Sequence, residues 1–226
     1  MKLQDQVCAT LREDILACRL RPGAELREQV LATRLNVSKS PVREALLRLA
    51  QERLVTIRPR QGYQVATVSM AEAADLLELR SVLELACLHG TLARASRAQR
   101  EAVAHNCEFE GNDFIAYNRQ FHTRLAGSCG NARLAQAAAT AIAQTDRLVH
   151  LSLGTITNRD PARLVTEHRA LAEAVAVSDA RTAKRLLRGH LEAAERRVLD
   201  GLTKALKAAP SDLASEEIPW TTLPSG

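Results

Sequence analysis

The sequence predicts a mainly α-helical protein made of two parts: short helices with a small β-hairpin, then an all-helical bundle. Three observations support this fold class. Apolar residues recur at helical spacing through most of the chain, the period changes to two only between residues 54 and 65, and the excess positive charge is confined to the beginning. Residues 1–66 hold 12 Lys and Arg against 7 Asp and Glu, whereas residues 67–226 hold 19 of each.

Composition excludes several classes of protein. The chain of 226 residues is 46% apolar and 25% charged, an ordinary globular balance that suffices for two modest domains. No apolar run approaches the ~18 to 20 residues of a membrane span, and the start lacks the apolar core of a secretory signal, so a cytoplasmic protein without membrane contact is expected. Five cysteines without a C-x-x-C pair indicate reduced thiols. The basic first part suggests a polyanion-binding module, although so modest a surplus can also arise by chance.

Three helices are predicted before the hairpin. Apolar spacing places them at residues 4–18, 28–35 and 38–51. The first helix ends before the helix-breaking Pro22-Gly23. A tight turn at Asn36-Val37 joins the second and third helices, which is the arrangement of a helix-turn-helix. The β signal follows, because residues 54–57 and 63–65 flank a polar loop and predict a small hairpin, or wing.

From Ser69 onward only helices are predicted. Ser69-x-x-Glu72 is a capping box that starts a helix to about residue 95. The expected core face of this helix includes Leu76, Leu79, Leu83 and Leu92. Further helices are expected at 97–107, 113–127, 131–152, 160–177 (with Asp160-Pro161 as N-cap and first residue) and 179–205. The predicted organisation is a DNA-binding domain at 1–66, a linker at 67–69, a helical effector-binding and dimerisation domain at 70–205 and a flexible tail at 206–226.

The start of the third helix carries an unusual arrangement of charge. Ser38 can cap this helix, and Pro41 costs little in the first turn. Lys39 and Arg43 then share an exposed face near the positive end of the helix dipole, where cations are unfavourable. Phosphates or guanine edges in a major groove would explain them, and pairing with Glu44 or neighbouring acids is the alternative. The core face of the helix is expected to hold Val42, Ala45, Leu46 and Leu49.

Two strings, LREQVLA at 26–32 and LNVSKSPVREAL at 35–46, resemble the winged helix-turn-helix of GntR-type transcriptional regulators. The resemblance covers residues 5–66. It departs from the family at Lys39, where Arg is usual and a bidentate fork becomes a point charge, and at Arg53, where Gly is usual. If position 53 is left-handed, a non-Gly residue there costs roughly 1 kcal/mol. The resemblance implies operator contacts by Gln29, Ser38, Lys39, Ser40, Arg43, Arg60 and Gly62.

Histidines suggest a second site in the helical part. Asn118 and His122 lie four residues apart and share a helix face, while His168 and His190 belong to two later helices. Such a set can converge in a bundle core around one transition-metal ion, because imidazole suits zinc or nickel. Hydrogen-bonded or exposed histidines are commoner than ligands. That second interpretation is kept for the other three histidines, His89, His105 and His150.

Residues 70–205 resemble the FadR-type C-terminal ligand-binding domain known as FCD. The resemblance rests mainly on Glu78-Leu79-Arg80 with Glu84, Phe121-His122, Glu167-His168-Arg169 and His190-Leu191. It implies that Asn118, His122, His168 and His190 hold a divalent metal, zinc or nickel, which helps to bind a small carboxylate effector. Asn118 replaces the Asp of many relatives and carries no charge, so a weaker metal site is expected. The segment between residues 95 and 118 is shorter than the resemblance implies, so the pocket is expected to be more open or its effector larger.

Arg80 is the candidate for a second clamp on the effector, and a salt bridge to Glu84 is the equal alternative. The predicted protein is a dimeric, effector-controlled transcription factor, usually a repressor, on an inverted repeat of double-stranded DNA. The second hypothesis is a DNA-binding homodimer whose helical domain is metal-free, differently liganded or purely structural. A metalloenzyme is remote, because the sequence lacks H-E-x-x-H, a Gly-rich phosphate loop and G-x-S-x-G, and Glu167 points about 100° away from His168.

Overall fold

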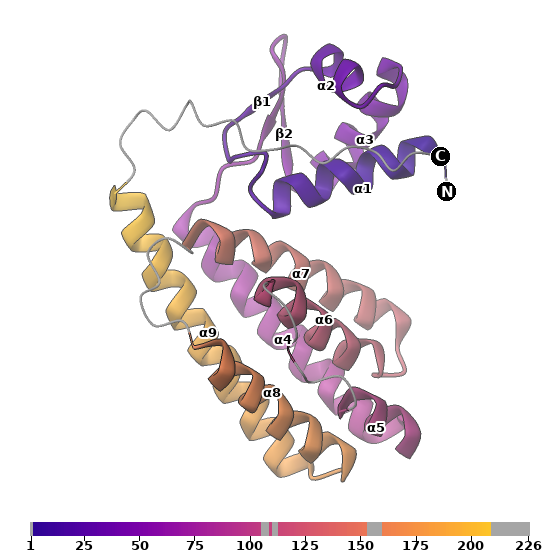
Figure 1. Cartoon of the computed structure of the whole chain (residues 1–226), viewed down its shortest axis with the longest axis vertical. Helices are drawn as coiled ribbons and strands as arrows, with labels where there is room; N and C mark the ends of the chain where they lie inside the picture. The colour runs from indigo at the N-terminus through magenta and orange to yellow at the C-terminus, as the bar shows by residue number, and fades with distance from the viewer. Residues whose placement is uncertain (1, 105–108, 110–112, 153–159, 209–226) are drawn as a thin grey trace. The chain divides into compact units, whose positions relative to one another are not determined.

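The computed structural model of the chain describes residues 2–104, 109, 113–152 and 160–208 (Figure 1). These residues form two compact units, and the second spans Met70–Ala208. The mainly α-helical fold class is confirmed, with one small sheet in the first unit and only helices in the described part of the second. His105 and residues 209–226 of the expected tail lie outside the described residues.

The first unit is organised around the packing of α1 (Leu3–Leu16) on α3 (Lys39–Gln51). Both helices lie within two residues of their predicted bounds, and the shorter α2 (Glu28–Arg34) packs on α3 as well. Two ion pairs join α1 to α3 and its C-cap: Arg48 of α3 pairs with Asp5, and Arg12 pairs with the C-cap residue Glu52. The core consists of Val7, Leu11 and Ile15 from α1 and the predicted face of α3, Val42, Ala45, Leu46 and Leu49.

The predicted hairpin consists of β2 (Val55–Arg58) and β3 (Gly62–Val65), which pair in antiparallel fashion. A third strand, β1 (Glu25–Leu26), pairs with β3, so the strand order is β1-β3-β2. The sequence analysis missed β1 because two residues are too few to show an alternating pattern.

The end of α3 has the left-handed residue that the sequence suggested. Arg53 has a φ of +59°. The Arg53 N–H donates to the Ala50 carbonyl at 3.1 Å, and the Leu54 N–H donates to the Leu49 carbonyl at 3.0 Å. These two bonds form a Schellman motif, in which glycine is the favoured left-handed residue.

Replacing Arg53 by glycine is therefore expected to raise the free energy of unfolding by about 0.5–1 kcal/mol, since glycine adopts this φ without a Cβ clash. The Arg53 side chain is exposed, so little packing is lost. Urea denaturation measures the effect. Gln51→Gly at the last residue of α3 is the control, because a right-handed helical position is destabilised by up to about 1 kcal/mol. Equal destabilisation in both variants would contradict the assignment of strain to Arg53.

The second unit is a helical bundle. Asp160 caps α8 as predicted, because its side chain accepts a hydrogen bond from the Arg163 N–H at 3.0 Å and Pro161 follows as the first helical residue. None of the described helices combines the length and hydropathy of a membrane span. The helices are α4 (Met70–Arg94), α5 (Arg97–Ala104), α6 (Phe114–Gly127), α7 (Ala132–Ser152), α8 (Pro161–Ala176) and α9 (Ala180–Ala208), the last of which ends three residues beyond its expected end.

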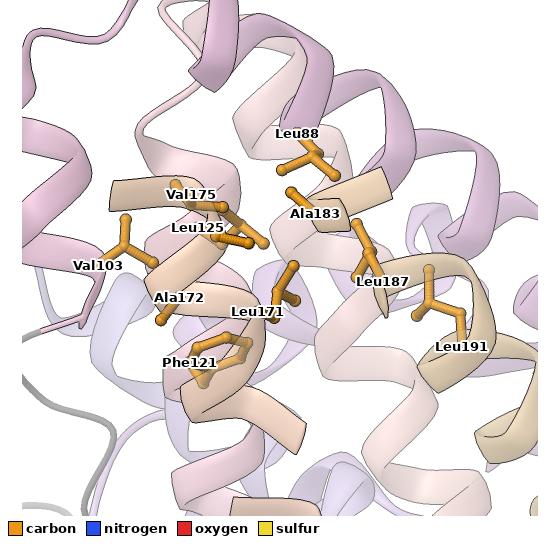
Figure 2. Close-up of a cluster of buried hydrophobic side chains, with 11 residues drawn as sticks. Leu88, Val103, Phe121, Leu125, Leu171, Ala172, Val175, Ala183, Leu187 and Leu191 are labelled. Atoms are coloured by element: carbon orange, nitrogen blue, oxygen red, sulfur yellow. The ribbon is translucent and has the colours of Figure 1, made fainter. Parts of the chain in front are cut away.

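A core cluster joins α4, α5, α6, α8 and α9. Figure 2 shows its side chains. Phe121 on α6 is the largest fully buried side chain of the described residues. It lies in the cluster with Leu125 of the same helix and Leu171 of α8. The remaining members are Leu88, Val103, Ala172, Ala174, Val175, Ala183, Leu187 and Leu191.

The buried face of α4 differs from the expected one. Leu79, which was expected in the core, is 51% exposed, whereas Arg80 and Glu84 are buried at 4% and 2% exposure. Apolar residues surround most of α4, so their spacing does not define a single inward face. The two buried charges pair with each other at 2.6 Å, which makes their burial tolerable.

Candidate DNA-binding surface and metal centre

The first turn of α3 presents polar side chains to solvent. Ser38, Lys39, Ser40 and Arg43 are all exposed. Ser38 occupies the N-cap position with an extended backbone, but its side chain makes no capping hydrogen bond, so the expected cap is wrong in that respect. Its hydroxyl therefore does not serve the helix N-terminus.

Arg43 binds a carboxylate from another helix. Its Nε and Nη2 donate to the two oxygens of Glu28 on α2, each at 2.8 Å. The sequence analysis considered pairing of Lys39 and Arg43 with Glu44 or neighbouring acids. Arg43 pairs with Glu28, and it is the Ser40 hydroxyl that donates to Glu44, at 3.4 Å. The hydrogen bond from Arg43 lowers the pKa of Glu28 against the effect of partial burial, so Glu28 is ionised at neutral pH.

The other expected DNA contacts come from α2 and the hairpin tip. Gln29 is exposed on α2, and its side-chain amide lies 3.4 Å from the Thr33 hydroxyl. Arg60 is exposed and Gly62 half-buried, with φ of +66° and +101° at the tip. Backbone in this conformation forms the tight turn that a wing needs. These positions are compatible with the expected contacts, which stay predictions.

In the second unit, three of the predicted metal ligands converge. His122 on α6, His168 on α8 and His190 on α9 are buried, and their ligand atoms all lie within 4.8 Å of one another. The Nε2 of His190 lies 3.2 Å from the Nε2 of His122 and 3.3 Å from the Nε2 of His168. The three helices thus bring together histidines that are up to 68 residues apart.

Each of these rings has a polar partner at its other nitrogen. Nδ1 of His122 lies 2.5 Å from Glu84, and Nδ1 of His190 lies 2.9 Å from Glu167. Nδ1 of His168 lies 3.4 Å from the Tyr117 hydroxyl. The sequence analysis missed these three roles, including that of Glu167, which it correctly directed away from His168. Metal-binding histidines usually have such partners at the nitrogen that does not face the ion.

Burial and charge determine the protonation of the cluster. Burial lowers the pKa of His122 to about 4 despite the opposing charge of Glu84. Burial, together with the charges of His122 and His190, also lowers the pKa of His168. Burial alone would raise the pKa of Glu84, but the charges of His122 and Arg80 outweigh it and lower the pKa to about 2. At neutral pH, His122 and His168 are neutral and Glu84 is ionised.

Arg80 lies beside the cluster, since its charge contributes to the lowered pKa of both His122 and His168. Its Nε donates to Glu84 at 2.6 Å, which is the salt bridge that the sequence analysis weighed against an effector clamp. Its Nη2 is buried and has no hydrogen-bond partner among the described residues. A buried charged donor without an acceptor is costly, and an anionic ligand that bound at this atom would remove that cost.

Three further residues were considered as metal ligands or as ordinary histidines: Asn118, His89 and His150. Asn118 is half-buried one helical turn before His122. His89 is exposed on α4, and His150 is half-buried on α7. Within the residues that the structure describes, neither belongs to a group of possible metal ligands.

Comparisons with known proteins place both units in described families. Residues 3–65 match the bacterial regulatory proteins of the gntR family, and residues 75–193 match the FCD domain. A crystal structure of a putative transcriptional regulator GntR from Rhodococcus sp. RHA1 has a TM-score of 0.73 and 24% identity, with 87% of this chain and 97% of that chain covered. That likeness shows a shared fold.

Two curated relatives are similar to this chain over almost its whole length. An uncharacterised HTH-type transcriptional regulator in an unstable DNA locus of Streptomyces ambofaciens is 32% identical over 212 residues, which cover 91% of this chain and 87% of the relative. The HTH-type transcriptional repressor RspR of Escherichia coli K12 is 27% identical, with 95% of each chain covered. The chain therefore belongs to the gntR family of bacterial regulatory proteins, and it is a transcriptional regulator with a DNA-binding first domain and an FCD second domain.

Proposed function

We propose that this regulator is a repressor whose operator binding is controlled by a small organic acid at a metal site in the FCD domain. The metal is a divalent transition ion, zinc or nickel, held by His122, His168 and His190 with Asn118 as a fourth ligand. The observation that carries the proposal is the convergence of three Nε2 atoms whose rings are held at Nδ1 by other residues.

The proton positions favour an ion at this point. A neutral imidazole that faces a carboxylate with Nδ1 carries its proton there and leaves a lone pair on Nε2. His122 and His190 both face carboxylates in this way, and their Nε2 atoms are 3.2 Å apart. Two lone pairs at that distance repel unless a cation, either a proton or a metal ion, lies between them. Nitrogens bound to one zinc ion at about 2.0–2.1 Å are themselves roughly 3 Å apart, so the donor set fits a metal.

The charge of the site favours an anionic effector. The histidines and Asn118 are neutral ligands, so a divalent ion keeps its charge, and Arg80 balances Glu84. We assign the Nη2 of Arg80, which has no partner among the described residues, as the second contact of a carboxylate effector. A metal would polarise and orient one end of such an acid, while Arg80 supplies a directed donor.

Operator control needs only a modest difference in effector affinity. We expect a homodimer on an inverted repeat, because one small winged helix reads few base pairs. An effector that favours the non-binding arrangement by roughly 1–3 kcal/mol lowers operator affinity roughly 5- to 150-fold. The similarity to RspR, a transcriptional repressor, supports repression as the direction of control.

The test combines elemental analysis with thermal melts, with and without chelator and a panel of small carboxylates. We expect close to one metal ion per chain, and an upward melting shift with one acid that chelator abolishes. His122→Ala is expected to lose the metal and the shift. His89→Ala is the matched control, because His89 is exposed and lies outside the cluster, and it is expected to keep both.

Equal metal content in the two variants would contradict the histidine site. Purified wild-type protein without metal, whose melting is unaffected by added zinc or nickel, would favour the second candidate, a DNA-binding dimer whose helical domain is structural.

A further inference from the structure

We propose that Glu28 is a positioning residue for DNA recognition: it orients Arg43 toward a base edge and disfavours the capture of Arg43 by phosphates. The inference rests on the proposed operator contact of Arg43. It starts from the bidentate pair between α2 and α3, in which both Glu28 oxygens accept from one edge of the guanidinium at 2.8 Å.

Stability does not account for this pair. The Arg43 side chain is 61% exposed, and ion pairs of exposed residues contribute little to folding. Glu28, in contrast, is only 20% exposed and is the first residue of α2. The pair therefore ties the exposed side chain of Arg43 to a more buried carboxylate on a neighbouring helix.

The geometry of the pair leaves the reading edge free. Glu28 uses Nε–H and one N–H of Nη2. The guanidinium has five N–H donors, so both N–H groups of Nη1 and the second of Nη2 are left without a partner in the part of the chain that the structure describes. The edge formed by Nη1 and Nη2 presents two parallel donors, which is the pattern that matches the O6 and N7 acceptors of guanine. Glu28 thus binds the Nε–Nη2 edge of Arg43, and the Nη1–Nη2 edge faces away from this pair.

The charge of Glu28 adds discrimination. Its pKa is lowered chiefly by the hydrogen bond from Arg43 and further by the charge of Lys39, so the carboxylate is ionised when DNA approaches. If Arg43 leaves the pair for a phosphate, this carboxylate faces a polyanion without its partner. If Arg43 stays and reads a base, the pair is kept. Glu28 therefore penalises sequence-independent contacts more than sequence-specific ones.

The experiment measures two affinities of the full-length chain at several salt concentrations. One probe is the duplex that the wild-type chain enriches from a randomised pool, and the other is the same duplex with shuffled sequence. We expect Glu28→Gln to bind the shuffled duplex several-fold more tightly and to reduce the ratio of the two affinities about 10-fold. Glu28→Asp keeps the charge but shortens the reach, so we expect a reduced ratio without tighter binding of the shuffled duplex.

Glu25→Gln is the matched control. Glu25 pairs with Arg27 in the same unit, both side chains are about two-thirds exposed, and the substitution removes the same charge. We expect it to strengthen both affinities equally. In an Arg43→Ala background, Glu28→Gln should leave the ratio unchanged, because the two residues act as one unit. Thermal melts of each variant would check that it is folded.

Two outcomes overturn the inference in different ways. If Glu28→Gln changes both affinities equally, as Glu25→Gln does, while Arg43→Ala loses the preference, then Arg43 reads DNA but Glu28 does not position it. If Arg43→Ala retains the wild-type ratio, the proposed operator contact itself is wrong, and the role of Glu28 falls with it.

Discussion

Replacing Glu84 by glutamine is expected to lower the free energy of unfolding by about 3–5 kcal/mol. Glu84 is 2% exposed and accepts hydrogen bonds from Arg80 and His122, which come from its own helix and from α6. Glutamine keeps the size of the side chain but removes the charge. The buried guanidinium of Arg80 then has no counter-ion, and its Nη2 already lacks an acceptor among the described residues.

Chemical denaturation of chelator-treated protein measures this loss, because chelation removes any contribution of a metal at His122. Glu101→Gln is the matched control. Arg97 and Glu101 form an ion pair with the same spacing and order, but their side chains are 84% and 42% exposed. We expect little measurable change there, since solvent screens an exposed pair. Similar losses in the two variants would show that burial of the Arg80–Glu84 pair has no special cost.

Arg43→Ala is expected to abolish most of the preference for the operator. One bidentate arginine–guanine contact provides roughly 5- to 150-fold discrimination, and a dimer makes the contact in each half-site. The side chain is exposed and its ion pair with Glu28 is largely open to solvent, so we expect the melting temperature to change little. Fluorescence anisotropy with the enriched and shuffled duplexes measures the loss.

Arg48→Ala controls for the removal of a positive charge from α3. Arg48 is exposed near the other end of the helix and pairs with Asp5 of α1. We expect it to weaken binding of both duplexes to a similar, small extent, without loss of preference. An unchanged preference in Arg43→Ala would remove the assignment of α3 as the reading element.

The DNA-binding unit was largely predictable from its local pattern. The core face of α3 was identified because Val42, Ala45, Leu46 and Leu49 follow helical spacing, and all are buried. In the second unit, the cap at Asp160 was identified for a similarly local reason, because capping depends on residues three positions apart. The strand β1 was missed, because two residues carry no period and their pairing partner lies almost 40 residues away.

The second unit shows where local pattern fails. Its leucine spacing predicted Leu79 in the core, but α4 turns Arg80 and Glu84 inward. The charges are accepted there because each has a partner, and one of those partners, His122, is 38 residues from Glu84. A periodicity argument assigns charged residues to the surface, so it could not find this face.

By itself, the sequence determined the two-part architecture, the family resemblance and the identity of the three converging histidines. Helical periodicity and short motifs are properties of neighbouring residues, and these are present before the chain folds. Only the tertiary structure decided which carboxylate holds which ring, and that Arg43 pairs with Glu28 across 15 residues. Such pairs depend on the rotation and packing of whole helices, because a small turn of one helix about its axis would exchange one buried partner for another.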